Sequence, residues 1–384
     1  MTSESKTDTH TALREQFGFP EFRPGQETAL SHVLAGRDTL VVMPTGSGKS
    51  LIYQLAALLL PRTTLVISPL VALMKDQVDS LARRGIDAAF INSTLTTAEQ
   101  QQRLRALAAG QYKILLVAPE RLRSQPFRGA MSAASLNLLV VDEAHCLSQW
   151  GHDFRPDYLQ IAAARRDFKA PTTLALTATA TPRVQEDIVR LLGLEHAEQL
   201  VTGFNRPNLS FEVLPAPDAR AKFRRLQSVL AEAEGAGIIY VGTRREAEEV
   251  AQFARQTCGI TQARHYHGAL DAATRTQTQD AFMAGDVPLV VATNAFGMGI
   301  DRPDLRFVFH YILPGSIEAY YQEAGRAGRD GLPARAILLY SARDTGLHEF
   351  FLENDSPTPA ELHKVHAFLS DLPAIEFEDD VAQV

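Results

Sequence analysis

Residues 41–50 read VVMPTGSGKS and carry the strongest structural signal in the chain. The apolar residues at its start predict a buried strand, and residues 51–60, LIYQLAALLL, predict a helix after it. A glycine-containing loop between a strand and a helix is the context that a P-loop requires. Glycine lets the backbone direct its N–H groups at an anion, and the helix N-terminus adds positive dipole there. This stretch therefore predicts a phosphate-binding site.

The P-loop pattern assigns roles to its polar residues. Lys49 is expected to reach the β- and γ-phosphates of ATP, and Ser50 to hold Mg²⁺. The loop before them is expected to cradle the phosphates with Thr45, Gly46, Ser47 and Gly48. The pattern has glycine at the position of Met43, so a glycine-rich turn with an unrelated lysine is the alternative.

Length and composition place the chain among globular proteins of more than one domain. With 384 residues, two or three domains are expected, and a hydrophobic content of 45% is ordinary for such proteins. The formal net charge of −7 gives no bulk electrostatic support for binding nucleic acid. Any such surface must therefore be a local patch.

Cysteine content and hydropathy predict a cytoplasmic protein without zinc. Cys146 and Cys258 are too few for a disulfide framework or a cysteine-rich zinc site. Residues 1–10 lack the apolar core of a secretory signal, and no apolar run approaches the roughly 18 residues of a membrane span. His265 and His267 suggest a metal pair, but without a cysteine or carboxylate cluster beside them ordinary polar roles are favoured.

Apolar runs of strand length alternate with helical patterns along the chain. The predicted strands lie at residues 40–42, 64–68, 113–118, 136–141, 173–176, 237–241, 287–292, 306–311 and 336–340. This alternation predicts an α/β fold with parallel sheets covered by helices on both faces. Ligands of such sheets gather beyond the carboxyl ends of the strands, and the polar motifs of this chain directly follow apolar runs.

The periodic pattern breaks at residues 205–208, NRPN, which predicts a domain boundary. A first lobe is expected over residues 13–205, and a second lobe without a P-loop over residues 206–345. The polar residues 1–12 are expected to be disordered, and residues 346–384 to form a short tail with one helix and an acidic end.

Asp142 and Glu143 directly follow the predicted strand at residues 136–141. A carboxylate at a strand end, in the same sheet as a P-loop, can hold Mg²⁺, and this role is expected of Asp142. Glu143 can polarise the attacking water. The alternative is an ordinary acidic turn, which the P-loop upstream disfavours.

Residues 17–26, FGFPEFRPGQ, have the chemistry of a pocket for a planar base. Phe19 is expected to stack on the base and Gln26 to bond its edge, with Arg23 in support. A turn packed by aromatic side chains is the alternative.

Arg326 and Arg329 lie three residues apart in YYQEAGRAGR, residues 320–329. On a helix this spacing would place both on one face. Two fixed guanidinium groups suit a phosphate with developing negative charge. The alternative is a solvated basic turn.

Together these stretches resemble a superfamily 2 helicase of the RecQ family, over roughly residues 15–345 and in the order of that family. The resemblance rests on FGFPEFRPGQ, MPTGSGKS, DEAH (142–145), SQWGHDFRPDY (148–158), ALTATAT, VVATNAFGMGID and YYQEAGRAGRDG. Members of the family commonly have the same methionine in the P-loop, so Met43 no longer counts against it. Residues 148–158 distinguish the RecQ family from other helicases best, because RNA helicases share the DEAH box.

Residues 148–158 also fit contact with single-stranded DNA. Bases of a single strand stack on aromatic side chains, and arginine adds charge and stacking. The stretch closely follows Asp142 and Glu143, so it is expected to couple DNA contact to hydrolysis. Its candidate contacts are Trp150, His152, Phe154, Arg155 and Tyr158.

The resemblance implies a motor with ATP between two RecA-like domains. The first lobe would supply Lys49, Ser50, Asp142 and Glu143, and the second Arg326 and Arg329. Asp301 would lie near the ribose. Nucleotide state would be linked to lobe movement by His145, Thr177 and Thr179. Loops that track the DNA backbone, or that simply cap helices, would include Thr243, Arg244 and Thr293.

The implied activity is DNA-stimulated ATP hydrolysis that drives 3′–5′ unwinding in DNA repair and recombination. The implied partners are single-stranded and partly duplex DNA and other repair proteins, with a monomeric motor in the cytoplasm or on a bacterial nucleoid. Many RecQ helicases carry a four-cysteine zinc module and a winged helix after the motor, and this sequence has neither. An RNA helicase and a binding module without catalysis are the alternatives. The aromatic stretch disfavours the first, and the intact catalytic set disfavours the second.

Overall fold

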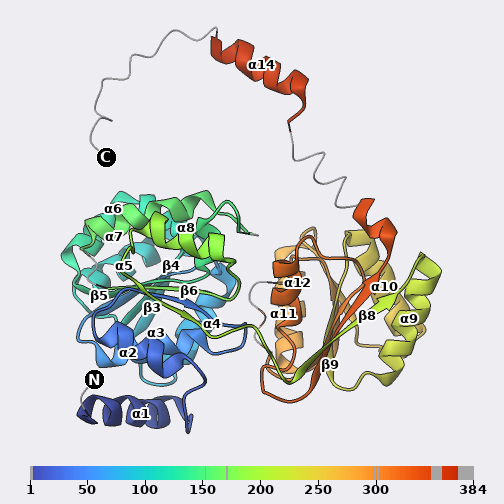
Figure 1. The fold of residues 1–384 in the computed structure, drawn as a ribbon, viewed down its shortest axis with the longest axis horizontal. Helices are drawn as coiled ribbons and strands as arrows, with labels where there is room; N and C mark the ends of the chain where they lie inside the picture. Colours follow the sequence, from blue (N-terminus) through green and yellow to red (C-terminus); the bar gives the residue numbers. More distant parts are fainter. Residues whose placement is uncertain are drawn as a thin grey trace.

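Two α/β units follow one another along the chain, each built on one parallel sheet (Figure 1). The computed structural model describes residues 3–151, 153–169, 172–297, 300, 302–346 and 357–370. The sequence therefore predicted the fold class correctly.

The first sheet has seven strands in the order β3-β4-β2-β5-β6-β1-β7. Its strands are β1 (Thr39–Val42), β2 (Thr63–Ile67), β3 (Ala88–Ile91), β4 (Ile114–Val117), β5 (Leu136–Val141), β6 (Thr173–Thr177) and β7 (Glu198–Val201). The helices of this unit are α1 (Ser3–Phe17), α2 (Gln26–Leu34), α3 (Lys49–Leu59), α4 (Val71–Ala82), α5 (Thr97–Ala108), α6 (Gln125–Ala133), α7 (Ile161–Asp167) and α8 (Pro182–Leu192). Short 3₁₀ turns are η1 (Pro119–Arg123), η2 (Ala144–Leu147) and η3 (Pro156–Gln160).

Both faces of this sheet are buried, and this explains why its strands are apolar throughout. In β1, Leu40 and Val42 join the hydrophobic cluster under α6, α7 and α8, whereas Val41 joins the cluster under α1, α2 and α3. The two sets of helices lie on opposite sides of the sheet in Figure 1.

The second sheet has six strands in the order β10-β11-β9-β12-β13-β8. Its strands are β8 (Leu209–Pro215), β9 (Ala236–Tyr240), β10 (Arg264–Tyr266), β11 (Leu289–Ala292), β12 (Leu305–His310) and β13 (Ala334–Tyr340). Its helices are α9 (Ala219–Glu232), α10 (Arg244–Gln256), α11 (Ala272–Ala284) and α12 (Ile317–Ala324), and the turn η4 covers Ala342–Asp344. Two hydrophobic clusters again separate the helices, with α9 and α10 on one and α11 and α12 on the other.

The N-terminal segment corrects an expectation. Residues 3–12, expected to be disordered, belong to α1. Leu13 and Phe17, one helical turn apart, pack into the cluster beneath α2 and α3, and Thr9 is buried as well. This packing stabilises a helix whose polar sequence alone would not predict it.

The expected tail helix is α14 (Pro359–Ser370), none of whose residues is buried. The acidic residues 376–380 lie outside the described residues. Among the helices that the structure describes, none is long and apolar enough to cross a membrane.

Candidate functional site

The P-loop joins β1 to α3 at the carboxyl end of the first sheet. Gly46 and Gly48 have φ angles of 79° and 80°, in the left-handed region that side chains disfavour. A Cβ at Gly48 would lie 2.5 Å from Gln26 Nε2, so a side chain there would displace the Gln26 amide from the loop. The buried Ser47 hydroxyl has no hydrogen-bond partner among the described residues. Such a loop fits a phosphate.

Lys49 is the first residue of α3, and its ammonium group turns back onto the loop. Nζ donates to the carbonyls of Met43, at 3.0 Å, and Pro44, at 3.3 Å. Burial lowers the pKa of Lys49, while the nearby carboxyls of Asp142 and Glu143 raise it. The cation therefore stands beside two acids inside the protein.

Asp142 follows β5, which pairs with β2, and Ser68 Oγ at the end of β2 lies 3.3 Å from Asp142 Oδ2. Burial, and next the neighbouring Glu143, raise the pKa of Asp142 to about 7. Two carboxyl groups held together with a single lysine have an excess of negative charge that a divalent cation would neutralise. This donor set, with the hydroxyl of Ser50 on α3, fits Mg²⁺.

Glu143 begins a chain of polar contacts that crosses the sheet. Its φ of 49° is unusual for a residue other than glycine, and its Oε2 is buried without a hydrogen bond among the described residues. His145 Nδ1 lies 3.4 Å from that oxygen and 2.9 Å from Thr177 Oγ1. Thr177 Oγ1 in turn donates to the Thr179 carbonyl at 3.1 Å. The structure thus brings residues 142–145 and 177–179 together.

The predicted base-binding residues lie beside the P-loop. Phe19, Arg23 and Gln26 line a cleft of about 900 Å³ together with Gly48 and Ser50. The other wall of this cleft includes Gln279 and Met283 of α11, from the second unit.

Gln26 and Arg23 also hold the loop directly. Gln26 Nε2 donates to the carbonyls of Ser47 (2.9 Å) and Gly48 (3.1 Å), and Arg23 Nη1 donates to the Gly46 carbonyl. Phe19 is 46% exposed, which leaves its ring available for stacking.

The two arginines of the second unit lie in a turn rather than on a helical face. Helix α12 ends at Ala324, so Arg326 and Arg329 follow it, and the prediction of a shared helical face is wrong. Arg329 packs on the P-loop, since a Cβ at Gly46 would lie 3.0 Å from Arg329 Cγ. Arg326 is only 6% exposed, and its Nε has no hydrogen-bond partner among the described residues.

Arg206, which the sequence analysis treated only as part of a boundary, connects the two units. Its Nη1 donates to the Thr45 carbonyl of the P-loop at 3.0 Å. Its Nη2 donates to the carbonyls of Ala327, at 3.0 Å, and Gly328, at 2.7 Å, in the arginine-bearing turn. The only sequence signal was an arginine in a segment without periodicity, and no motif indicated these partners.

Trp150 stands at the exposed tip of the aromatic stretch, with 61% of its surface accessible. Its ring lies under the Arg183 guanidinium, 3.4 Å from ring centroid to Cζ. Its backbone N–H donates to Ser148 Oγ, which donates to Asp187 of α8. Phe154 is partly buried, and Arg155 is paired with Asp153 at 2.8 Å. His152 lies outside the described residues.

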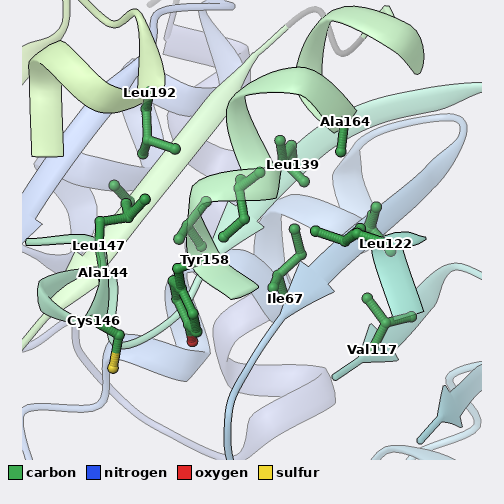
Figure 2. Close-up of a cluster of buried hydrophobic side chains, with 14 of the residues drawn as sticks. Ile67, Val117, Leu122, Leu139, Ala144, Cys146, Leu147, Tyr158, Ala164 and Leu192 are labelled. Carbon is green, nitrogen blue, oxygen red and sulfur yellow. The ribbon is translucent and has the colours of Figure 1, made fainter. Parts of the chain in front are cut away.

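The prediction that Tyr158 stacks on bases is wrong. Its side chain is fully buried in the hydrophobic cluster of Figure 2, which also contains Leu139 and Ile67 of the first sheet. Its hydroxyl donates to the Asp142 carbonyl at 2.9 Å. The ring therefore offers no face to a base. It anchors the aromatic stretch to the end of β5.

Two loops of the second unit were expected to contact DNA or to cap helices. Thr243 caps α10, because its hydroxyl accepts from Glu246 N–H while the Glu246 carboxylate accepts from Thr243 N–H. Arg244 is the first residue of α10. Thr293 follows β11, and its N–H donates to the Tyr266 carbonyl. Asp301 lies outside the described residues.

The fold and this site define a P-loop protein with two RecA-like domains. The DEAD/DEAH box helicase family model matches residues 23–188, and the helicase conserved C-terminal domain matches residues 221–331. A structure of an S. cerevisiae Dbp5 variant bound to RNA and ADP BeF3 has a TM-score of 0.70 at 18% identity, with 95% of this chain and 92% of that chain covered. At that identity the likeness bears on the fold alone.

Two curated relatives narrow the class. ATP-dependent DNA helicase RecQ of Haemophilus influenzae is 44% identical over 360 residues, which cover 93% of this chain and 58% of that protein. Probable ATP-dependent DNA helicase RecS of Bacillus subtilis is 41% identical over 360 residues, which cover 94% of this chain and 72% of that protein. The chain belongs to the RecQ family of superfamily 2 helicases. It spans a little over half the length of the RecQ proteins it matches.

Proposed function

We propose that this chain is the motor of an ATP-dependent 3′–5′ DNA helicase, in which DNA-stimulated ATP hydrolysis drives translocation and unwinding. The observation that carries the proposal is the link between two sites. The Asp142 carboxylate acts electrostatically on the P-loop lysine and raises its pKa, and the Asp142 carbonyl accepts a hydrogen bond from Tyr158 of the aromatic stretch. Contact of a single DNA strand with Trp150 can thus influence the site of ATP hydrolysis.

The proposed hydrolysis is in-line attack of water on the γ-phosphorus of ATP, in which the bond from this phosphorus to the β–γ bridging oxygen breaks and ADP leaves. Glu143 orients the water, and Lys49, with Arg326 and Arg329, stabilises the charge that develops on the phosphate. Ser50 and Asp142 would hold Mg²⁺, which when bound supplies further positive charge. The loop from Thr45 to Gly48 would hold the phosphates, Phe19, Arg23 and Gln26 the base, and Asp301 the ribose.

The proposed coupling between lobes uses contacts of the site. His145, Thr177 and Thr179 lie in one hydrogen-bonded series, and His145 lies 3.4 Å from the Glu143 carboxylate. Arg206 joins the P-loop to the arginine turn. We assign the first lobe to the predicted residues 13–205 together with the rest of α1, and the second to residues 206–345, so Arg206 lies where they meet.

The proposed substrate is single-stranded or partly duplex DNA. Trp150 has an exposed face for base stacking, and Phe154, Arg155 and His152 would extend the contact. Thr243, Arg244 and Thr293 would meet the phosphate backbone. Following the family, we place the activity in DNA repair and recombination, on the nucleoid or in the cytoplasm, with a monomeric motor and repair proteins as partners.

Steady-state ATP hydrolysis tests the proposal. We expect single-stranded DNA to stimulate hydrolysis at a fixed low salt concentration, and RNA of the same length to stimulate it less. The variant Lys49→Ala controls for contaminating ATPases. Stimulation by RNA alone would overturn the choice of DNA, and absence of hydrolysis under every condition would overturn the motor itself.

A further inference from the structure

A cluster of two histidines and a glutamate lies in the second unit, apart from the nucleotide site. His265 belongs to the edge strand β10, His267 directly follows it, and Glu248 belongs to α10. The sequence argued against a metal here because no carboxylate stood near the histidines. The fold supplies one from 19 residues upstream of His267, because α10 packs against β10.

The geometry points to a binding site for a divalent transition-metal ion, Zn²⁺ above all, formed by Glu248, His265 and His267. One ligand atom from each residue lies within 4.8 Å of the other two. His267 Nε2 and Glu248 Oε1 are 3.2 Å apart. Ligands about 2.0–2.1 Å from a tetrahedral zinc are separated by roughly 3.3 Å, so this pair already has the spacing of two zinc ligands.

The alternation of side chains along a strand explains why both histidines reach the same point. Residues two apart point to one side, and the His265 and His267 rings are nearly parallel, at 21°, with centroids 5.5 Å apart. Two imidazoles and one carboxylate form a ligand set that zinc accepts, with water as a fourth ligand.

Burial makes the site more than a surface ion pair. His267 is 4% exposed, and its Nδ1 has no hydrogen-bond partner among the described residues, whereas its Nε2 lies within hydrogen-bond distance of Glu248. Glu248 is 60% exposed, which leaves the site open to an ion from solvent. An ion here would join β10 to α10, in which Glu248 lies four residues after Arg244.

Direct metal binding tests this inference without using ATPase activity. The chain, without an affinity tag and treated with a chelator, is titrated with Zn²⁺ by calorimetry in excess Mg²⁺, and with Co²⁺ by visible absorption. We expect one strong equivalent of Zn²⁺ and the absorption bands of tetrahedral Co²⁺. Glu248→Gln and His265→Asn should each weaken Zn²⁺ binding by at least about tenfold, since each removes a ligand.

A matched control lies one residue further along α10. Glu249 pairs with Arg245 at 2.6 Å and is not part of the cluster, so Glu249→Gln should leave Zn²⁺ affinity unchanged. Glu248→Gln alters an exposed, isosteric side chain, so its fold should survive, which thermal unfolding would verify. No strong equivalent of Zn²⁺, or equal affinity in wild type, Glu248→Gln and His265→Asn, would overturn the site.

Discussion

Replacing Arg206 with alanine should impair ATP hydrolysis, although this residue lies outside the sequence motifs that predict the nucleotide site. Its guanidinium donates to the Thr45 carbonyl on one unit and to the carbonyls of Gly325, Ala327 and Gly328 on the other. One hydrogen bond therefore joins the P-loop to the turn that carries Arg329, and the others fix the shape of that turn.

The magnitude follows from the bond between the units. A hydrogen bond to a charged donor contributes about 1.5–3 kcal/mol, and each 1.36 kcal/mol changes a rate constant tenfold. If this bond is needed to align Arg329, kcat/KM for ATP should fall roughly 10- to 100-fold in Arg206→Ala. Arg206→Lys keeps the charge but lacks the forked donor, so it should recover only part of the loss.

The assay is steady-state ATP hydrolysis at saturating single-stranded DNA, with thermal unfolding to check the fold. Arg225→Ala, at an exposed position of α9, serves as the control and should behave as wild type. A folded Arg206→Ala protein with wild-type kcat/KM would refute the reasoning, because the contact would then be incidental to the site.

Four further substitutions separate the parts of the site. Lys49→Ala should abolish turnover without changing thermal unfolding, and normal hydrolysis would end the P-loop assignment. Trp150→Ala should keep basal ATPase activity and lose its stimulation by DNA, and unaltered stimulation would contradict this role. Tyr158→Phe should cost about 1 kcal/mol of folding stability through one lost hydrogen bond, and unaltered stability would contradict the anchoring role of Tyr158. Burial raises the pKa of Asp142 to about 7, which is above the pKa of a carboxyl group in the unfolded chain. Without Mg²⁺, the protonated Asp142 therefore contributes to folding stability at acidic pH. This contribution is lost as the pH rises through 7, by up to about 1.4 kcal/mol per pH unit. Asp142→Asn should remove this part of the slope in urea titrations at pH 5 to 8, and an identical slope would exclude Asp142 as its source.

The sequence predicted central strands well and edge strands poorly. Strands β1 and β5 are buried on both faces, and their uninterrupted apolar runs are visible in one dimension. The edge strand β7 alternates between half-buried and exposed positions, β8 is buried only at its first residue, and β10 has only three residues, so none gave a sufficient apolar run. The pairing that defines them comes from neighbouring strands distant in sequence.

Individual side chains of the site were predictable where a motif fixes the backbone, and less so elsewhere. The spacing of Trp150, Phe154 and Tyr158 was visible, but whether each ring points to solvent or to the core depends on η3 and the sheet beneath it. Arg206 and Glu248 act through partners far along the chain, and no local pattern records such contacts. Sequence reasoning therefore found residues that a loop shape determines and missed those that packing between elements determines.

The aromatic stretch is held against residues 145–146 by close backbone contacts. Gly151, next to Trp150, lies so close to residues 145–146 that a Cβ at Gly151 would be 2.4 Å from the His145 carbonyl oxygen. The stretch is tied to the same segment again where Arg155 N–H donates to the Cys146 carbonyl. A displacement of Trp150 by a bound base must therefore be taken up by residues 145–146, since close-packed interiors transmit strain rather than absorb it. His145 lies within 3.4 Å of Glu143, so even a shift of a few tenths of an ångström would alter the position of the carboxylate proposed to orient water.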